Sequence, residues 1–260
     1  MPASYYVACT VLALLLFAFG SVIGSFLNVV IYRVPQGISV AKGRSFCPSC
    51  GKTLRPLDMV PVFSWLALRG RCRSCGAPIS PRYPLVECAG GALALLCVGA
   101  LGPTPLAAVA FGALCVLLCV ACIDAATMEI PNGLVLALAA SALLAVPAAP
   151  GVGLLSRLLG AAEISLPLFL CTRLVPESFG GGDVKLMAAA GFLLGWRATL
   201  AAAFLALVGG GLYGVWLLAT RRAGRKSHFA FGPFLAGGIG VALLWGEGLI
   251  SGYLSLFGLA

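Results

Sequence analysis

Long uninterrupted apolar blocks run through this 260-residue chain, and they constrain its fold more than any other feature. A helix needs about 20 apolar residues to cross a bilayer, and only helices or closed barrels satisfy their backbone polar groups in lipid. The blocks lack the alternation of lipid-facing and lumen-facing residues that a barrel strand shows. The composition agrees, because 61% of the residues are hydrophobic and only 10% are charged. The sequence therefore predicts an all-α polytopic membrane protein.

Proline, glycine and charged residues divide the apolar sequence into eight expected membrane-spanning helices. Their approximate bounds are 5–32, 84–102, 104–123, 132–149, 152–173, 184–196, 198–220 and 233–258. The sixth is short for a full span, and tight turns are expected at Gly102-Pro103 and around Trp196-Arg197. The first block has no basic start and no cleavage site, so it is interpreted as a retained span rather than a signal peptide. The expected organisation is a first helix over 1–32, an insertion over 33–83 and a seven-helix membrane core over 84–260.

Basic residues indicate the orientation of these helices, because short cytoplasmic loops are enriched in Lys and Arg. Nine of the 17 basic residues lie in 33–82, and counting the other loops gives 15 on that side of the membrane against two on the other. The largest other cluster comprises Arg221, Arg222, Arg225 and Lys226, and the two residues on the far side are Arg157 and Arg197. The insertion is therefore expected to be cytoplasmic and both termini to face outward. The net charge of +9 is interpreted as a topology signal, and no nucleic-acid partner is expected.

The insertion contains two C-x-x-C pairs, separated by 21 residues and each followed directly by glycine. Their members are Cys47, Cys50, Cys72 and Cys75. Two such turns can direct four thiolates at one ion, as in a tetrahedral zinc site. Reducing conditions in the cytoplasm argue against structural disulfides. A site with four protein ligands leaves no open position, so the expected zinc is structural; a redox dithiol is the alternative.

Acidic residues are rare in this chain, and four lie near the expected cytoplasmic ends of membrane helices. They are Asp124, Glu129, Glu177 and Asp183. Ionisable groups at membrane depth are costly and usually face a polar cavity or a partner. The charge-derived topology places Asp124 and Asp183 on the same side at similar depth, which allows the two carboxyl groups to face each other. Two structural alternatives remain open: Asp183 could be a helix N-cap, and Asp124 could pair with a basic residue.

A facing pair of carboxyl groups has a specific chemistry. In a site of low dielectric constant the two groups share a proton and titrate in coupled steps. One group can then act as a base on water while the other, protonated, polarises a carbonyl. This arrangement suits hydrolysis of a peptide bond without a covalent intermediate. Gly180 and Gly182, beside Asp183, are expected to leave room for an extended substrate backbone.

Six motifs, in order along most of the chain, resemble those of the prepilin peptidases, also called type IV leader peptidases. They are GSFLNVVIYRVP (24–35), the paired C-x-x-C motifs, RCRSCGAPISPRYPLVE (71–87), Asp124 followed after six residues by Pro131-Asn132, GGGDVK (180–185) matching G-x-G-D-V-K, and FGPFL (231–235).

This resemblance implies a bifunctional enzyme of the bacterial inner membrane. It would remove the basic leader from type IV prepilins or secretion pseudopilins at the cytoplasmic membrane face, and then N-methylate the new terminus with S-adenosylmethionine. Asp124 and Asp183 would carry the peptidase chemistry, and the four cysteines would shape the cytoplasmic domain. The sequence shows no glycine signature for the methyl donor, so residues that bind it are not identified.

Two further residues near the aspartates have open roles. Glu129 is interpreted as a solvated loop residue, with tuning of the acid pair or binding of the basic leader as alternatives. Lys185 is expected to anchor or pair at the membrane interface rather than to act as a base. The alternative function for the whole chain is a proton-coupled transporter with a zinc-ribbon regulatory loop. A third hypothesis is a membrane-tethered zinc-ribbon binding module. The sequence does not indicate the oligomeric state.

Overall fold

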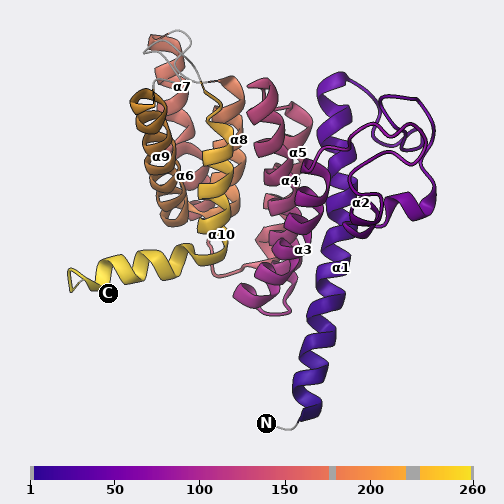
Figure 1. Ribbon diagram of the computed structural model, residues 1–260. Helices are drawn as coiled ribbons and strands as arrows, with labels where there is room; N and C mark the ends of the chain where they lie inside the picture. The colour runs from indigo at the N-terminus through magenta and orange to yellow at the C-terminus, as the bar shows by residue number, and fades with distance from the viewer. Residues whose placement is uncertain (1–2, 176–179, 221–228, 259–260) are drawn as a thin grey trace. The chain divides into compact units, whose positions relative to one another are not determined.

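The computed structural model describes residues 3–175, 180–220 and 229–258, in which every regular element is a helix (Figure 1). The main helices are α1 (Ala3–Arg33), α3 (Arg82–Leu101), α4 (Pro105–Thr127), α5 (Asn132–Ala148), α6 (Leu154–Glu163), α7 (Ser165–Leu174), α8 (Gly181–Leu194), α9 (Trp196–Ala219) and α10 (Gly232–Ser255). The insertion between α1 and α3 carries the short helix α2 (Phe63–Ala67) and two 3-10 turns, Val34–Gln36 and Pro56–Met59. Glu177 and the basic cluster at 221–226 lie outside the described residues.

The expected all-α membrane fold is confirmed, but the expected count of eight spans is not. Six helical stretches of the described chain are long and apolar enough to cross a bilayer. They are Ser4–Gln36, Arg82–Leu101, Pro105–Thr127, Leu154–Leu174, Trp196–Ala219 and Gly232–Ser255. The remaining two expected spans are shorter: α5 has 17 residues and α8 has 14. At 1.5 Å per residue a helix like α8 is only about 21 Å long, less than the roughly 30 Å of a hydrocarbon core.

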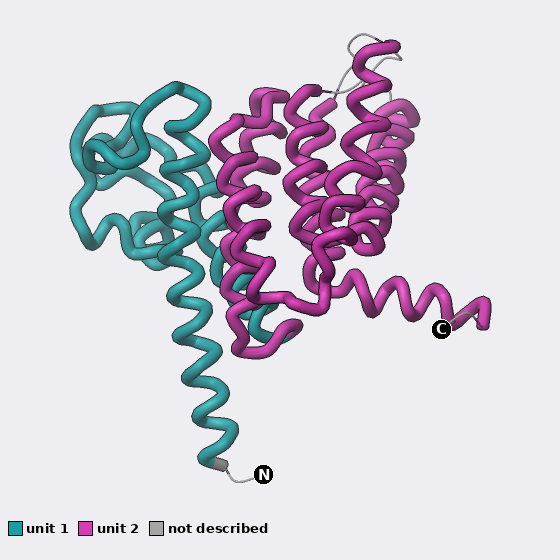
Figure 2. The backbone as a smooth tube through the Cα atoms, turned by 180° about the vertical axis from the view of Figure 1, so that it is seen from behind, with its two compact units in different colours: residues 1–99 teal, residues 100–260 magenta. Residues whose placement is uncertain are grey.

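The chain forms two compact units, residues 1–99 and residues 100–260 (Figure 2). The first contains α1, the insertion and nearly all of α3, and the second contains α4 to α10. Each expected chemical feature falls within one unit: the four cysteines belong to the first, and Asp124 and Asp183 belong to the second. The finer division at 32 and 83 stays a prediction.

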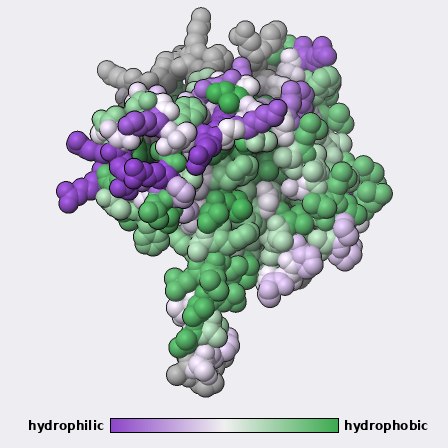
Figure 3. Space-filling view, turned by 90° about the vertical axis from the view of Figure 1, so that its right-hand side faces the viewer, coloured by the Kyte–Doolittle hydropathy of each residue, from purple (hydrophilic) through white to green (hydrophobic). Residues whose placement is uncertain are grey.

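In the first unit, α1 and α3 pack against each other through glycine. A Cβ atom placed on Gly20 would overlap the backbone of Gly90, so the two helices touch main chain to main chain. Close approach of this kind is the usual way in which small residues bring membrane helices together. Most of the side chains between Tyr5 and Phe19 are exposed and apolar, and hydrophilic side chains gather around the insertion (Figure 3).

In the second unit, the expected span 152–173 is a helical stretch with a break. α6 ends at Glu163 and α7 begins at Ser165, with Ile164 between them. α6 packs on α8 through Gly160 and Gly191, where a Cβ atom on either residue would overlap the backbone of the other. Gly238 of α10 makes the same kind of contact with Ala202 of α9. The contact between Gly160 and Gly191 therefore helps to position α8, the helix that carries Asp183.

Arg157, which the count of basic residues assigned to the outer side of the membrane, is wholly buried in α6. Its guanidinium group donates hydrogen bonds of 3.0–3.2 Å to five backbone carbonyl oxygens near the ends of α5, α6 and α8. Those carbonyls belong to Ala145, Ala149, Val152, Phe192 and Leu193. Carbonyl groups in the last turn of a helix have no partner within that helix. Arg157 thus joins the ends of α5 and α8 at the end of α8 remote from Asp183.

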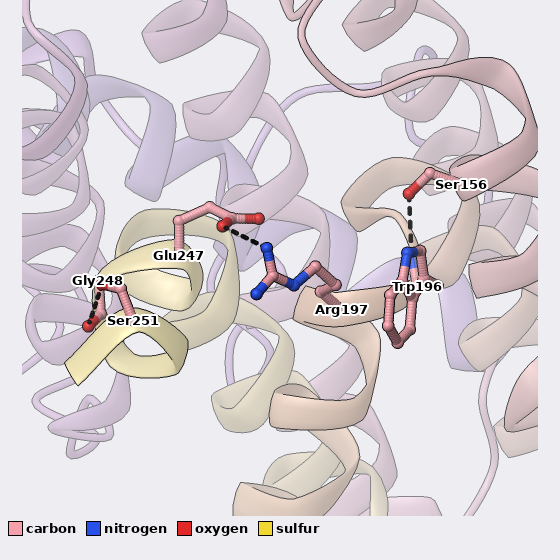
Figure 4. Close-up of polar contacts among 6 residues, drawn as sticks. All are labelled: Ser156, Trp196, Arg197, Glu247, Gly248 and Ser251. Atoms are coloured by element: carbon pink, nitrogen blue, oxygen red, sulfur yellow. Dashed lines mark hydrogen bonds and ion pairs between the residues drawn. The ribbon is translucent and has the colours of Figure 1, made fainter. Parts of the chain in front are cut away.

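The expected tight turn between the sixth and seventh helical segments is confirmed. Gly195, with φ of 79°, separates α8 from α9. The amide of Trp196 donates to the hydroxyl of Ser156 at 3.4 Å, and Arg197 lies 3.9 Å from the exposed carboxylate of Glu247 (Figure 4). The start of α9 is therefore linked to α6 by a hydrogen bond and to α10 by a surface ion pair, a kind of contact that contributes little energy.

Candidate active site

Asp124 lies in the last turns of α4 and is 5% exposed. Its Oδ2 atom accepts a hydrogen bond of 2.8 Å from the backbone amide of Gly232, the first residue of α10. The first amides of a helix have no partner within the helix, so they are available to an anion. A Cβ atom at position 232 would lie 2.6 Å from the same Oδ2 atom, so the carboxylate approaches this amide only because residue 232 is glycine.

Asp183 lies at the third position of α8 and is 9% exposed. The N-cap is Gly180, so the interpretation of Asp183 as the N-cap is wrong. The carboxylate nevertheless helps to start the helix, because its Oδ2 atom accepts a hydrogen bond of 3.2 Å from the Gly180 amide. Both aspartates thus have one oxygen held by a backbone N–H group at the start of a helix.

One cavity of about 320 Å³ brings Asp124 and Asp183 together, although they lie on different helices. Its other lining residues are Met128, Glu129, Ile130, Asn132, Gly180, Gly181, Gly182 and Lys185. Both carboxyl groups are buried, so two negative charges in this cavity would interact more strongly than in water. Among the described residues, nothing donates to the Oδ1 atom of either aspartate. Each carboxyl group therefore has one oxygen held by a backbone amide and one oxygen to which no described residue donates.

The two glycines expected to leave room for substrate both line this cavity. A Cβ atom on Gly182 would lie 2.8 Å from the Cβ atom of Ile130, so Gly182 is required for packing of α8 against the segment before α5. A Cβ atom on Gly180 would lie 3.3 Å from Oδ2 of Asp183. Contact of either glycine with a substrate stays a prediction.

The neighbouring charged residues have different surroundings. The Nζ atom of Lys185 donates to Oδ1 of Asn132 at 3.0 Å, which links α8 to the first residue of α5. This hydrogen bond agrees with the expected pairing role of Lys185. Glu129 is exposed and lines the cavity, where it adds a third acidic side chain.

The four cysteines of the first unit form two matching turns. In the first, the amide of Cys47 donates to Lys52 and the amide of Gly51 donates back to Cys47. In the second, Cys72 donates to Ala77 and Gly76 donates back to Cys72, with all four distances between 2.8 and 2.9 Å. Gly51 and Gly76 have φ values of 70° and 71°, which glycine adopts without strain.

The sulfur atoms of this tetrad fit a tetrahedral metal ion. All four lie within 4.8 Å of one another, and Sγ of Cys47 is 3.9 Å from Sγ of Cys75. Zinc–sulfur bonds of about 2.3 Å in a tetrahedron separate the sulfurs by about 3.8 Å. None of the four is in a disulfide. Backbone N–H groups of Cys75 and Ser74 lower the pKa of Cys72 to about 6, which favours the thiolate that a metal needs.

Sequence reasoning missed one residue of the carboxylate site, Gly232. The FGPFL motif gave a signal, since glycine followed by proline is common at the start of a helix. The motif alone did not indicate that the amide of residue 232 would meet Asp124, 108 residues earlier.

Comparisons with known proteins agree with this arrangement of two units. A family model described as the bacterial peptidase A24 N-terminal domain matches residues 18–101, and one for the type IV leader peptidase family matches residues 111–215. A relative from Burkholderia pseudomallei named prepilin leader peptidase/N-methyltransferase is 37% identical over 257 residues, covering 87% of this chain and 83% of its own. A protein of the same name from Bacillus subtilis is 36% identical, and the match covers 93% of this chain and 98% of the relative. Another from Aeromonas hydrophila is 35% identical, and the match covers 94% of each chain. No solved structure gives a significant match.

Proposed function

The chain belongs to the type IV leader peptidase family, and from this premise we propose how its residues perform the activities for which its relatives are named. It is a multi-pass membrane enzyme that removes the leader peptide of prepilin-like precursors and N-methylates the new terminus. The transporter alternative has no support in these matches. The observation that carries the peptidase assignment is the shared cavity of Asp124 and Asp183, each anchored through one oxygen.

Asp124 and Asp183 are the proposed catalytic pair. One carboxylate takes a proton from water as the water oxygen attacks the scissile carbonyl carbon, while the protonated partner donates a hydrogen bond to the carbonyl oxygen. The C–N bond of the resulting tetrahedral intermediate then breaks, and a proton passes to the leaving nitrogen. The products are a leader that ends in a carboxylate and a mature protein that begins with a free amine.

The tetrad of Cys47, Cys50, Cys72 and Cys75 holds a structural zinc ion in this proposal. Four thiolates complete the coordination of the metal, so it has no open position for substrate. The metal would join the two turns of an insertion that has little regular structure.

The second activity requires a methyl donor. When bound, S-adenosylmethionine supplies a methyl group from its sulfonium centre to the amine that cleavage releases. The proposed location is the bacterial inner membrane, with the insertion in the cytoplasm, both termini outside and lipid around the apolar helices. The distribution of basic residues, 15 against two, supports this orientation.

Cleavage of a purified pilin-like precursor by Asp124→Asn and Asp183→Asn variants tests the catalytic pair. Asparagine retains an oxygen that can accept the backbone hydrogen bond but cannot exchange the catalytic proton, so each variant should lose about 1,000-fold or more in kcat/KM. Glu247→Gln removes an exposed acid outside the cavity and serves as the matched control. Full cleavage by either asparagine variant would eliminate the two-carboxylate mechanism.

A further inference from the structure

A second, larger cavity of about 760 Å³ lies within residues 1–99, and the peptidase mechanism does not use it. Its walls come from α1, the insertion and the start of α3. The volume falls in the range of cavities that bind small molecules and cofactors. The lining mixes aromatic, cationic and amide side chains, and the most informative of them are Asn28, Trp65, Arg82, Tyr83 and Glu87.

Asn28 presents a buried acceptor without a partner. The residue is 2% exposed, and its Nδ2 atom donates to the carbonyl oxygens of Tyr83 at 3.0 Å and Gly24 at 3.4 Å. These two bonds fix the orientation of the amide, because the opposite orientation would set oxygen against oxygen. Its Oδ1 atom is then left without a hydrogen bond in the described chain. A buried polar atom in this state usually indicates a ligand or an ordered water molecule.

Arg82 presents the complementary group, a buried donor. Its Nε atom also lacks a hydrogen-bond partner among the described residues, its guanidinium group lies 5.7 Å from the centre of the Tyr83 ring, and its side chain lines the same cavity. Of the other cations that line the cavity, Arg33 donates to three backbone carbonyls and Arg73 pairs with Asp58 at 2.8 Å. Lys52 and Arg55 also line it but are exposed. The cavity therefore offers an acceptor at Asn28 and a cationic donor at Arg82, which suits a ligand with both an amino or hydroxyl group and a carboxylate.

Trp65, an aromatic residue that lines the cavity, is held in place by hydrogen bonds. The Nε1 atom of Trp65 on α2 donates to the carbonyl of Ile79 at 3.1 Å. α2 is fixed in turn by Glu87 of α3, whose carboxylate accepts a 2.7 Å hydrogen bond from the amide of Val62. Val62 has φ of 63°, a costly conformation for a β-branched residue and one that is concentrated at ligand sites. Such a ring offers a flat apolar surface to a purine base.

We propose that this cavity binds S-adenosylmethionine, with Trp65, Asn28 and Arg82 as the residues that hold it. The donor combines a flat base, ribose hydroxyls, an ammonium group and a carboxylate, and the cavity supplies an aromatic face, an acceptor and a cation to match them. The proposal rests on the methyltransferase half of the proposed function. It gives that reaction a site separate from the cavity of the two aspartates.

Ultraviolet crosslinking of radiolabelled S-adenosylmethionine to the wild-type, full-length protein in detergent provides a direct test. Peptide mapping should place the label within residues 22–87. Label confined to residues 100–260 would overturn the proposal, as would a tightly held phospholipid in this cavity that S-adenosylmethionine fails to displace. The wild-type protein is used, so the result does not depend on the folding of a variant.

Calorimetric titration with S-adenosylmethionine supplies the second readout. Arg82→Gln and Trp65→Leu should each weaken binding by about tenfold or more. Arg44→Gln, an exposed arginine of the insertion outside the cavity, should bind like the wild type. Unchanged binding by both cavity variants would overturn the assignment. Mass spectrometry of the cleaved product distinguishes this proposal from the proposed methyltransferase function. If the product is methylated but the crosslinked S-adenosylmethionine maps outside residues 22–87, only this binding site is refuted. If the product is cleaved but not methylated, the methyltransferase function is refuted.

Discussion

The backbone amide of Gly232 lies 2.8 Å from Oδ2 of Asp124 and donates a hydrogen bond to it, joining the start of α10 to the last turns of α4. This contact fixes one oxygen of a carboxyl group that lines the cavity shared with Asp183. The position of one member of the proposed catalytic pair therefore depends on a residue that has no side chain.

Gly232→Ala should reduce cleavage by about 100-fold, because misplacement of a catalytic group by about 1 Å has an effect of that order. The added Cβ atom would lie 2.6 Å from Oδ2 of Asp124 and would push the carboxylate or α10 aside. Gly237→Ala is the matched control, since a Cβ atom there meets nothing within 4 Å. Steady-state cleavage of a pilin-like precursor measures both variants. Equal rates for the two would show that the Gly232 contact does not position the carboxylate.

Gly182→Ala should impair cleavage while Gly181→Ala has little effect. A Cβ atom on Gly182 would meet Ile130 at 2.8 Å, whereas one on Gly181 meets nothing within 4 Å. The same assay should show partial rescue when Ile130→Gly is combined with Gly182→Ala, because the clashing atom is then removed. If the double variant is no more active than Gly182→Ala, the glycine serves the substrate backbone rather than helix packing.

Lys185→Met should lower cleavage by only a few-fold. The lost contact is an exposed hydrogen bond of 3.0 Å to Asn132, and such bonds contribute about 1 kcal/mol. Asn132→Ala should have a similar effect, and the double variant should be no worse than either single variant. A loss approaching that of Asp183→Asn would instead assign Lys185 a direct part in catalysis.

Cys50→Ser should abolish stoichiometric zinc, measured by elemental analysis of the purified protein, and should make residues 44–80 sensitive to protease. A structural zinc site contributes directly to the stability of the segment that it closes. Cys9→Ser, on α1 and outside the tetrad, should retain the metal. One zinc per chain in Cys50→Ser would exclude the tetrad as the metal site.

Much of the fold and part of the site could be predicted from the sequence. Hydropathy located the helices, and the spacing of the C-x-x-C pairs predicted the tetrad, because both are local properties of the chain. Counting basic residues predicted that Asp124 and Asp183 lie on the same side of the membrane at similar depth, and the structure places both in one cavity. The break at Ile164 was not predicted, although Pro167 gives a signal for it, because proline cannot donate a hydrogen bond to the carbonyl of Glu163, four residues earlier. The roles of Gly232 and Asn28 depend on which helices pack together, and no local pattern specifies that.

A membrane chain must both enter the bilayer and assemble there, and these two steps place different demands on its small residues. Close backbone contacts join Gly20 with Gly90, Gly160 with Gly191 and Gly238 with Ala202. Entry into the bilayer depends on summed hydrophobicity, so exchanging Gly191 for leucine would favour insertion by the translocon. Assembly after insertion depends on backbones that touch, and the same exchange would hold α6 and α8 apart. A variant of this kind would reach the membrane at normal abundance and still lack activity. Expression level is therefore a poor measure of correct assembly for this enzyme.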